Sequence, residues 1–566
     1  MGLRRIRYRL LLTLFVICII AFTARLLDYF KTTHSEWSFL NLVSSGPNRF
    51  YTANLEAPDF WSKVFKVFEV NKLQLPLENL DDAIRYIDKS QQKDGPSTKE
   101  NLLSKAYIPE EVQLELKQKH FKVMNELPSE IPKALYKKDM CGVVLVGGGR
   151  FSWLAYLALL SLRRSGSRIP AEVVMPKLAD YENELEFCKV VLPKLNAECV
   201  VIPEELGSVV TMNWAKNLAS YQFKILALLV SSFQNVLLLD SDNIIIENPD
   251  SIFESDLFHN YGMITWSDYW SRTISPIFYD VLGIKVNEKK RVRYNRFPLR
   301  VPPDVTDSIP DSNSVPYHDL EGAIPDLSTE SGQLFVNKLT HGKTLLLALY
   351  YNLNGPNVFY KLFSLGEQGA GDKDTFAAAA VATSQKYYQV NSFIKTLGYF
   401  DNNGNYRGVA MAQKDPLVDY AFYEQLVLKP QISKENIDMT LEDQFERLEI
   451  LKKEKFDSNN NVPIFCIHCN FPKLDPLELF GEDSLYDAEK RRLKYRLYGG
   501  IKIELKFQSL DLEGAENKEV DFELQQWEMM YKSLCKDKIH FTHFKDTNMD
   551  ELCQKITNEI QWLAET

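Results

Sequence analysis

The sequence lacks an excess of positive charge. Its 566 residues carry 66 Lys and Arg against 76 Asp and Glu, which gives a net charge of -10 at pH 7. Proteins that bind nucleic acid neutralise phosphates with clustered Lys and Arg, so this balance argues against a nucleic-acid partner. An anionic substrate would have to be held by a local site.

Three other features are missing. No Asn-x-Ser/Thr sequence with a permitted middle residue occurs, so we expect no N-linked glycan. No repeat of fixed period occurs, which argues against a solenoid or a propeller. Beyond the amino-terminal segment there is no run of apolar residues long enough to cross a bilayer, so we expect a single membrane span.

That amino-terminal segment contains one apolar stretch, residues 10–24, which several arginines precede. Arginines keep the end that precedes a span in the cytosol. We therefore predict a cytosolic tail at 1–9, an uncleaved transmembrane anchor at 10–27 and a lumenal remainder. A cleaved signal peptide is the alternative, because Ala21 and Ala24 are small.

Composition divides the remaining chain in two. Residues 28–138 combine lone aromatic residues, short helical patterns and a polar break at 93–101. We interpret them as a lumenal stem. Residues 139–566 are long and apolar enough to bury a large core, and we assign the catalytic domain to them.

The eight cysteines fit a lumenal location only in part. Cys18 lies in the predicted span, which leaves an odd number beyond it, so at least one thiol is free or intermolecular. Proximity favours pairing Cys188 with Cys199 and Cys535 with Cys553, but sequence alone fixes no connectivity.

Strand-like and helix-like patterns alternate at the start of the catalytic domain. Residues 141–147, 171–176 and 197–203 are predicted strands, and residues 151–166 and 182–195 are predicted helices. This alternation predicts an α/β fold with a doubly wound, mostly parallel sheet. In such sheets ligands bind outside the carboxyl ends of the strands.

A glycine triplet follows the first of these strands. Gly148 and Gly149 lack Cβ atoms and would let a nucleotide approach the backbone closely, so they are candidate donor-binding residues. A tight turn from strand to helix explains the same glycines, and both interpretations stay open.

Two aspartates stand at the end of the apolar run "NVLLL". Asp240 and Asp242 follow this predicted buried strand, where the binding crevice should lie. A tight turn brings both carboxylates to one side, and their mutual repulsion is relieved by a shared divalent cation. We predict a metal site; a plain surface turn is the alternative.

The stretch "VLLLDSDN" followed by "NPDSIFE" resembles nucleotide-sugar transferases of the GT-A fold. The resemblance implies that Lys224 contacts the donor, as a basic residue does in retaining members. "TESGQLFVNK" resembles the segment that lines the donor sugar and contains Glu330 and Gln333. "GEQGAGDKDTFAAAA" resembles the acidic segment that follows, with Asp372 and Asp374 at the start of a helix.

The segment "FCIHCNFPKLDP" completes the pattern. In related retaining transferases a late His is a further metal ligand and a nearby Lys holds the diphosphate, and His468 and Lys473 resemble that pair. The spacing between His468 and Lys473 is one residue shorter than is usual in those transferases. A zinc site with Cys466 and Cys469 is one alternative, although structural zinc usually needs a second pair of ligands. A packed core histidine is the other.

Together these motifs closely resemble the fungal Golgi α-mannosyltransferases that add α-1,2-mannose branches to the mannan outer chain. The likeness runs from about residue 140 to near 500 and includes the tail, anchor and stem. It implies GDP-mannose as donor, Mn²⁺ as cofactor, a mannose-terminated glycan as acceptor and retention of the α-anomer. It also implies a single-pass type II protein of the Golgi membrane, with a Golgi glycosyltransferase complex as a possible assembly.

The chemistry requires negative charge to be stabilised on the departing diphosphate and positive charge on mannose. An acidic group beneath the anomeric carbon can stabilise the cation or act as nucleophile. Asp374 is our first candidate, Glu330 the second and Asp372 the third; attack from the front face, with no covalent intermediate, stays open.

For the acceptor, the aromatic cluster Trp266, Tyr269 and Trp270 suits stacking on sugars, with core packing as the alternative. Arg272 is a candidate contact with the donor or the acceptor.

Two other classes of protein are alternatives. Phosphatases of the haloacid-dehalogenase type also place Asp-x-Asp after a buried strand, but their motif continues differently from Asn243-Ile244 and opens the domain. A noncatalytic lumenal glycan-binding protein is the second alternative. Within the transferase interpretation, an α-1,3 linkage is the alternative to α-1,2, because the acceptor pocket cannot be located from the sequence.

Overall fold

The structure is a computed structural model, and it describes the greater part of the chain. The described residues are 56–74, 83–93, 95–302, 305, 307–309, 311–432, 439–458, 462–506 and 517–566. The predicted tail and anchor, 1–27, lie outside them, as does the first part of the predicted stem. Within these ranges no helix combines the length and the apolar composition that crossing a bilayer requires.

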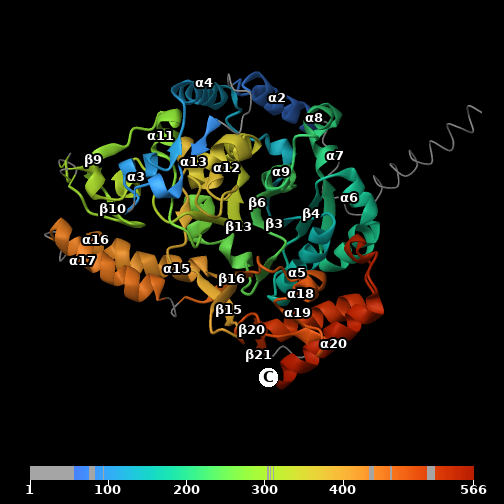
Figure 1. Ribbon diagram of the computed structural model, residues 1–566. Helices are drawn as coiled ribbons and strands as arrows, with labels where there is room; N and C mark the ends of the chain where they lie inside the picture. The colour runs from blue at the N-terminus through green and yellow to red at the C-terminus, as the bar shows by residue number, and fades with distance from the viewer. Residues whose placement is uncertain are drawn as a thin grey trace, which may run out of the picture. The chain divides into compact units, whose positions relative to one another are not determined.

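A mixed sheet forms the centre of the unit from Leu55 to Thr566 (Figure 1). Its strands are β3 (Lys137–Val146), β4 (Ala171–Met175), β5 (Ala197–Val201), β6 (Phe233–Leu239), β8 (Met263–Ser267), β13 (Thr329–Asn337) and β14 (Tyr388–Gln389). They lie in the order β14, β8, β13, β6, β3, β4, β5. Paired neighbours are parallel except at β13, which is antiparallel to both β6 and β8. The doubly wound, mostly parallel sheet is thereby confirmed.

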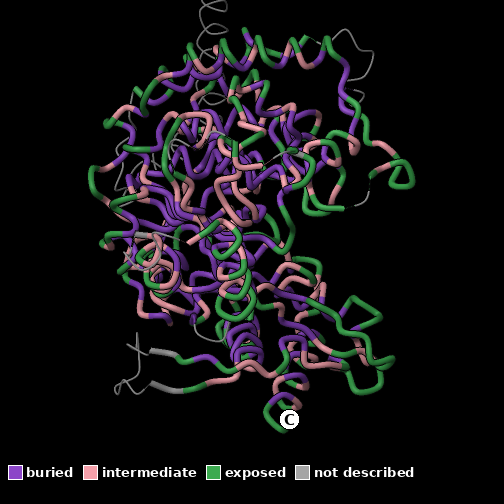
Figure 2. The backbone as a smooth tube through the Cα atoms, turned by 90° about the vertical axis from the view of Figure 1, so that its left-hand side faces the viewer, coloured by how far each residue is buried: buried purple, intermediate pink, exposed green. Residues whose placement is uncertain are grey.

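Both faces of this sheet are covered, as its apolar sequences require. Alternate residues such as Val144, Val236 and Val336 pack into one core with three helices, while their neighbours Val143 and Leu237 are buried on the other face. The three helices are α9 (Gln222–Val230), α12 (Lys338–Leu353) and α14 (Thr375–Ala382). Helix α5 (Arg150–Arg164) also packs on β3. In Figure 2 the buried residues gather in the interior and the exposed residues lie mostly at the periphery.

A second, antiparallel sheet adjoins the first. Its order is β15, β16, β17, β7, with β15 at Lys395–Phe400, β16 at Tyr406–Lys414, β17 at Ile464–His468 and β7 at Asn243–Ile245. Three residues separate the end of β6 from the start of β7, so the segment 240–242 joins the two sheets. The predicted metal motif therefore lies at the seam between them.

The described part of the predicted stem does not stand apart from the catalytic domain. Helices α2 (Ala57–Val70) and α4 (Glu110–Glu126) contribute buried residues to the same core as the central sheet. The Phe68 ring stacks on Tyr350 of α12 at 5.9 Å between centroids, and His120 Nε2 lies 2.9 Å from the Tyr351 hydroxyl. The described residues of this segment, 56–74, 83–93 and 95–138, are part of the folded unit.

The carboxyl-terminal region contains a two-stranded hairpin and two helices. They are β20 (Lys502–Lys506), α19 (Phe522–Met530) and α20 (Met549–Glu565), with β21 (Asn517–Asp521) pairing against β20. The shorter helices are α3 (Lys99–Leu103), α6 (Leu178–Asn183), α7 (Ile202–Leu206), α8 (Ser208–Trp214), α10 (Asp256–Tyr261), α11 (Pro276–Leu282), α13 (Tyr360–Ser364), α15 (Pro416–Tyr423), α16 (Lys429–Ile432), α17 (Leu441–Leu451) and α18 (Pro476–Gly481).

The cysteine pairs that proximity favoured both form disulfides. Cys188 bonds Cys199, and Cys535 bonds Cys553. In the described part of the chain Cys141, Cys466 and Cys469 are free thiols, which agrees with the odd number beyond the predicted span.

Candidate active site and metal centre

The seam between the two sheets brings the predicted metal ligands together. Asp240 leaves the carboxyl end of β6, and its N–H donates to the Gly332 carbonyl at 2.7 Å. His468 ends β17 and is paired in register with Asn243, the residue after Asp242. The Cys469 N–H donates to the Asp242 carbonyl at 2.9 Å. Strand pairing therefore places an imidazole beside two carboxylates that lie far from it in sequence.

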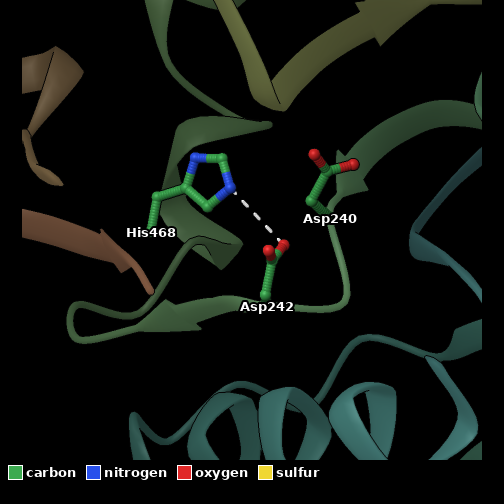
Figure 3. Close-up of side chains that lie close together, drawn as sticks. All are labelled: Asp240, Asp242 and His468. Atoms are coloured by element: carbon green, nitrogen blue, oxygen red, sulfur yellow. Dashed lines mark ion pairs between the residues drawn. The ribbon is translucent and has the colours of Figure 1, made fainter. Parts of the chain in front are cut away.

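The three side chains form a compact cluster. One ligand atom from each of Asp240, Asp242 and His468 lies within 4.8 Å of the others. His468 Nε2 is 3.4 Å from Asp242 Oδ1, and Figure 3 shows the two groups turned toward each other beside Asp240. Two carboxylates and an imidazole are donors that suit a divalent cation such as Mn²⁺. The donor set fits the metal that the sequence predicts.

The cysteines do not join this cluster. Among the described residues, Asp240, Asp242 and His468 are the one group of three or more potential ligands close enough to share an ion. Cys466 and Cys469 are buried, and Cys469 Sγ contacts the Ile467 carbonyl at 3.7 Å. A cysteine-ligated zinc site therefore finds no support here.

Lys224 supplies positive charge to the cluster from helix α9. Its Nζ lies 3.0 Å from Asp240 Oδ2 and 3.2 Å from Asp372 Oδ2, and it donates to the Ser331 carbonyl at 3.2 Å. Burial lowers the pKa of Lys224, but Asp240 and Asp372 outweigh burial and raise it above its ordinary value. Lys473 contacts Asp242 in the same way. Both lysines thus lie beside the aspartate pair, and their contact with a donor stays a prediction.

The crowding of carboxylates has electrostatic consequences. Burial raises the pKa of Asp240 to about 6, against the opposing effect of Lys224. Burial also acts to raise the pKa of Asp242, but His468 and Lys473 lower it below the usual range. Burial lowers the pKa of His468, whereas Asp242 and Glu330 raise it well above normal. Positive charge at the centre of the cluster therefore stabilises it.

A cavity of about 530 Å³ opens beside the cluster. Asp240, His468 and Lys224 line it, together with Glu330 and Asp372. It lies at the carboxyl ends of β6 and β8, where ligands bind in doubly wound sheets. Further lining residues are Tyr221, Asp268, Tyr269, Trp270, Ser331, Gln368, Gly369, Ala370, Gly371, Lys373, Thr396, Gly408, Val409, Ala410, Met411, Asn470 and Phe471.

Glu330 and Asp372 lie in this cavity, as a role at the donor sugar requires. Glu330 Oε1 accepts the Gly332 N–H at 2.6 Å and lies 3.3 Å from His468 Nδ1. Asp372 Oδ1 accepts the Ser331 hydroxyl at 3.1 Å. Burial raises the pKa of Glu330, but His468 and Lys224 reverse this effect and lower it to about 2. Glu330 is thus held ionised at the cavity wall.

Asp374 occupies a different environment, and this corrects its place as first catalytic candidate. Its Oδ1 pairs with Arg272 Nη1 at 2.6 Å and accepts the Thr329 N–H at 2.9 Å, while Oδ2 accepts the Ser328 hydroxyl. Arg272 is fully buried and also donates to the carbonyls of Pro325 and Leu327. Neither residue lines the cavity. The pair supports the loops around the site and has no free group for donor or acceptor.

The remaining donor-site candidates lie near the cluster but not on the cavity wall. Gly148 and Gly149 have φ values of 95° and 55° and form the tight turn between β3 and α5. The Ser241 hydroxyl donates to the Val146 carbonyl, so this turn adjoins the aspartate motif. Gln333 is fully buried and its Oε1 accepts from Asn243 Nδ2 at 2.6 Å. A contact of these residues with a donor stays a prediction.

The aromatic cluster divides into two parts. Trp266 is completely buried, stacks on Phe465 and donates its indole N–H to the Lys414 carbonyl at 2.7 Å, so the core-packing alternative holds for it. Tyr269 and Trp270 are exposed and line the cavity. Of the three aromatic residues, Tyr269 and Trp270 are placed to contact an acceptor and Trp266 is not.

Sequence reasoning missed the ion pair of Asp268 and Lys373. Asp268 follows the carboxyl end of β8, its Oδ2 contacts Lys373 Nζ at 2.5 Å, and both residues line the cavity. Burial and the nearby Glu330 raise the pKa of Asp268 to about 6. Asp268 closely follows the apolar run "MITW", as Asp240 follows "NVLLL", and this pattern is the signal that could have found it.

Comparison with known proteins places this site in a family. The family described as "Mannosyltransferase putative" matches residues 140–415. The α-1,2-mannosyltransferase MNN23 of Candida albicans is 54% identical over 90% of this chain and 85% of its own length. The α-1,2-mannosyltransferase MNN2 of Saccharomyces cerevisiae is 37% identical over 77% of this chain and 71% of its own.

The chain belongs to the fungal α-1,2-mannosyltransferase family. This membership makes it a hexosyltransferase and confirms the resemblance drawn from the motifs. Among solved structures, the galactosyltransferase LgtC is 9% identical over 44% of this chain and 73% of its own, with a TM-score of 0.24, too low to support an argument about fold or site. The matched segment 140–415 contains both aspartates of the cluster, whereas His468 lies beyond it.

The burial of Arg272 predicts that Asp374→Asn destabilises the protein. Removing one partner leaves the guanidinium buried and unpaired, so the free energy of unfolding should fall by about 3–5 kcal/mol. Chemical denaturation followed by tryptophan fluorescence measures this change. The exposed Asp59→Asn is the matched control and should change stability by less than about 0.5 kcal/mol. An equal, small effect of both variants would contradict the structural role of Asp374.

Proposed function

We propose that the protein transfers mannose from GDP-mannose to a mannose-terminated glycan, forms an α-1,2 linkage with retention, and depends on Mn²⁺. The observation that carries this proposal is the cluster of Asp240, Asp242 and His468, of which Asp240 and His468 line the cavity. The names of its relatives support the linkage. The arginine-rich, apolar amino terminus supports a type II anchor in the Golgi membrane.

The residues around the cluster suit the departure of a diphosphate. A divalent cation held by the two aspartates and the histidine would supply the positive charge that a leaving diphosphate needs. Lys224 and Lys473 add fixed positive charge beside the same aspartates. Because the lysines are held in place by ion pairs, little reorganisation is needed as charge develops on the leaving group.

Glu330 is the proposed carboxylate beneath the anomeric carbon. It lies in the cavity beside the cluster of predicted metal ligands and is held ionised, whereas Asp374 forms an ion pair with Arg272. An ionised carboxylate there can stabilise positive charge on the sugar or attack the anomeric carbon as leaving-group electrons pass to GDP. Asp372 shares Lys224 with Asp240 and is proposed to hold that lysine in position. Front-face attack by the acceptor hydroxyl stays open.

A transfer assay tests the proposed function. We expect the full chain, incubated with GDP-mannose, Mn²⁺ and mannobiose, to release GDP only when the acceptor is present. NMR of the trisaccharide should show a new α-1,2 bond. A product with an α-1,3 bond would support the alternative linkage, and absence of acceptor-dependent release at every metal concentration would support a noncatalytic glycan-binding protein.

Replacement of Glu330 tests the mechanism. We expect Glu330→Gln to lower kcat by about 10²–10³-fold, because a charge that stabilises the transition state is lost. The Kd for GDP-mannose, measured by calorimetry, should change far less, since the phosphate contacts remain. Asp59→Asn is again the control and should leave both values unchanged. A kcat within about twofold of wild type would remove Glu330 from the reaction.

A further inference from the structure

Exposed aromatic residues surround the mouth of the cavity. Tyr269, Trp270 and Phe471 all line it, and all three are exposed. The Tyr269 and Trp270 rings contact each other edge to face, with 5.4 Å between centroids. Rings that line a cavity and stay exposed offer flat apolar faces to a ligand.

The hairpin of β15 and β16 extends this aromatic surface away from the cavity. Its inner part, including Thr396 and Met411, lines the cavity. Its outer end carries Phe400 and Tyr406, which are paired across the hairpin with their rings 5.2 Å apart. Phe400 is 67% exposed and Tyr406 is 46% exposed. From Thr396 to Phe400 the strand rises about 13 Å, at roughly 3.3 Å per residue.

Tyr406 connects the outer end of the hairpin to the cavity. Its hydroxyl donates to the Thr396 carbonyl at 3.2 Å, so the side chain lies back along the hairpin toward the cavity wall. Thr396 lines the cavity together with Tyr269 and Trp270, so this hydrogen bond joins Tyr406 to the wall of the cavity.

The charges at the hairpin tip neutralise one another. Arg407 Nη2 lies 2.8 Å from Asp401 Oδ2, and Asp401 also accepts the N–H groups of Asn403 and Asn405 within the turn. None of the five aromatic residues carries a charge at neutral pH. The surface therefore suits a neutral ligand with flat apolar faces and polar edges. A pyranose ring has this character, and a nucleotide does not.

We propose that Phe400 and Tyr406 form a remote acceptor subsite, which binds mannose units beyond the one that receives the new sugar. This inference rests on the proposed mannosyl transfer and specifies its substrate class: a neutral, α-linked oligomannoside of several units. The chain of sugars runs from the cavity mouth at Tyr269 and Trp270 along the β15–β16 hairpin. The subsite makes the enzyme prefer long acceptors over short ones.

Kinetics with acceptors of two lengths test this subsite. In the double variant Phe400→Ala/Tyr406→Ala, KM for mannohexaose should rise at least about threefold, because two stacking surfaces are lost. KM for mannobiose, KM for GDP-mannose and kcat should all stay within about twofold of wild type, since these side chains lie outside the cavity. Tyr406→Phe keeps the ring and should retain the wild-type KM for mannohexaose.

Phe121→Ala is the matched control, because Phe121 is 69% exposed on α4 and does not line the cavity. It should change no KM. Saturation-transfer NMR of mannohexaose and mannobiose without GDP-mannose gives a readout that needs no turnover, so the subsite can be judged even if the transfer assay fails. Loss of hexaose contacts in the double variant alone would support the subsite. Equal effects on both acceptors, no effect on either, or the same effect in Phe121→Ala would overturn it.

Discussion

Repulsion between buried carboxylates is the constraint on which this site depends. Asp240, Glu330 and Asp372 line one cavity, Asp242 lies beside Asp240 in the same cluster, and all but Asp240 are buried. Lys224, Lys473 and His468 each pair with at least one of them. A cluster of this kind is stable only with positive charge inside it, and a departing diphosphate needs that same charge. The buried carboxylates lower the stability of the folded protein, and the positive charge that they hold in the site also suits sugar transfer.

The topology of the two sheets creates this concentration of charge. Strand β13 runs antiparallel to β6, so its first residues, with Glu330 and Ser331, lie beside Asp240 at the carboxyl end of β6. The chain then passes directly from β6 into β7 of the second sheet, whose pairing with β17 adds His468. Residues from several distant segments are thus fixed by backbone hydrogen bonds, which hold a site more precisely than loops can.

Local pattern was enough to predict much of this arrangement. Apolar runs ending in Asp240 and in the glycine turn predicted strands β6 and β3, and the resemblance placed Lys224, Glu330, Asp372 and His468 at one site. The sequence could not reveal that Asp374 pairs with Arg272. That contact joins residues 102 apart, and no local signal distinguishes Asp374 from Asp372. Composition likewise gave no sign that residues after 56 pack on α12, since isolated aromatic residues suit either a stem or an interface. Phe400 and Tyr406 of the β15–β16 hairpin can be interpreted as a binding surface only when the cavity beside them is known.

The central claim is that Asp240, Asp242 and His468 bind one divalent cation, and a Mn²⁺ titration followed by electron paramagnetic resonance tests it most directly. We predict one tightly bound ion per chain in the wild type, and an affinity at least about 100-fold weaker in Asp242→Ala, because a charged ligand is lost. Unchanged Mn²⁺ affinity in Asp242→Ala would contradict the account of both the cluster and the cavity beside it.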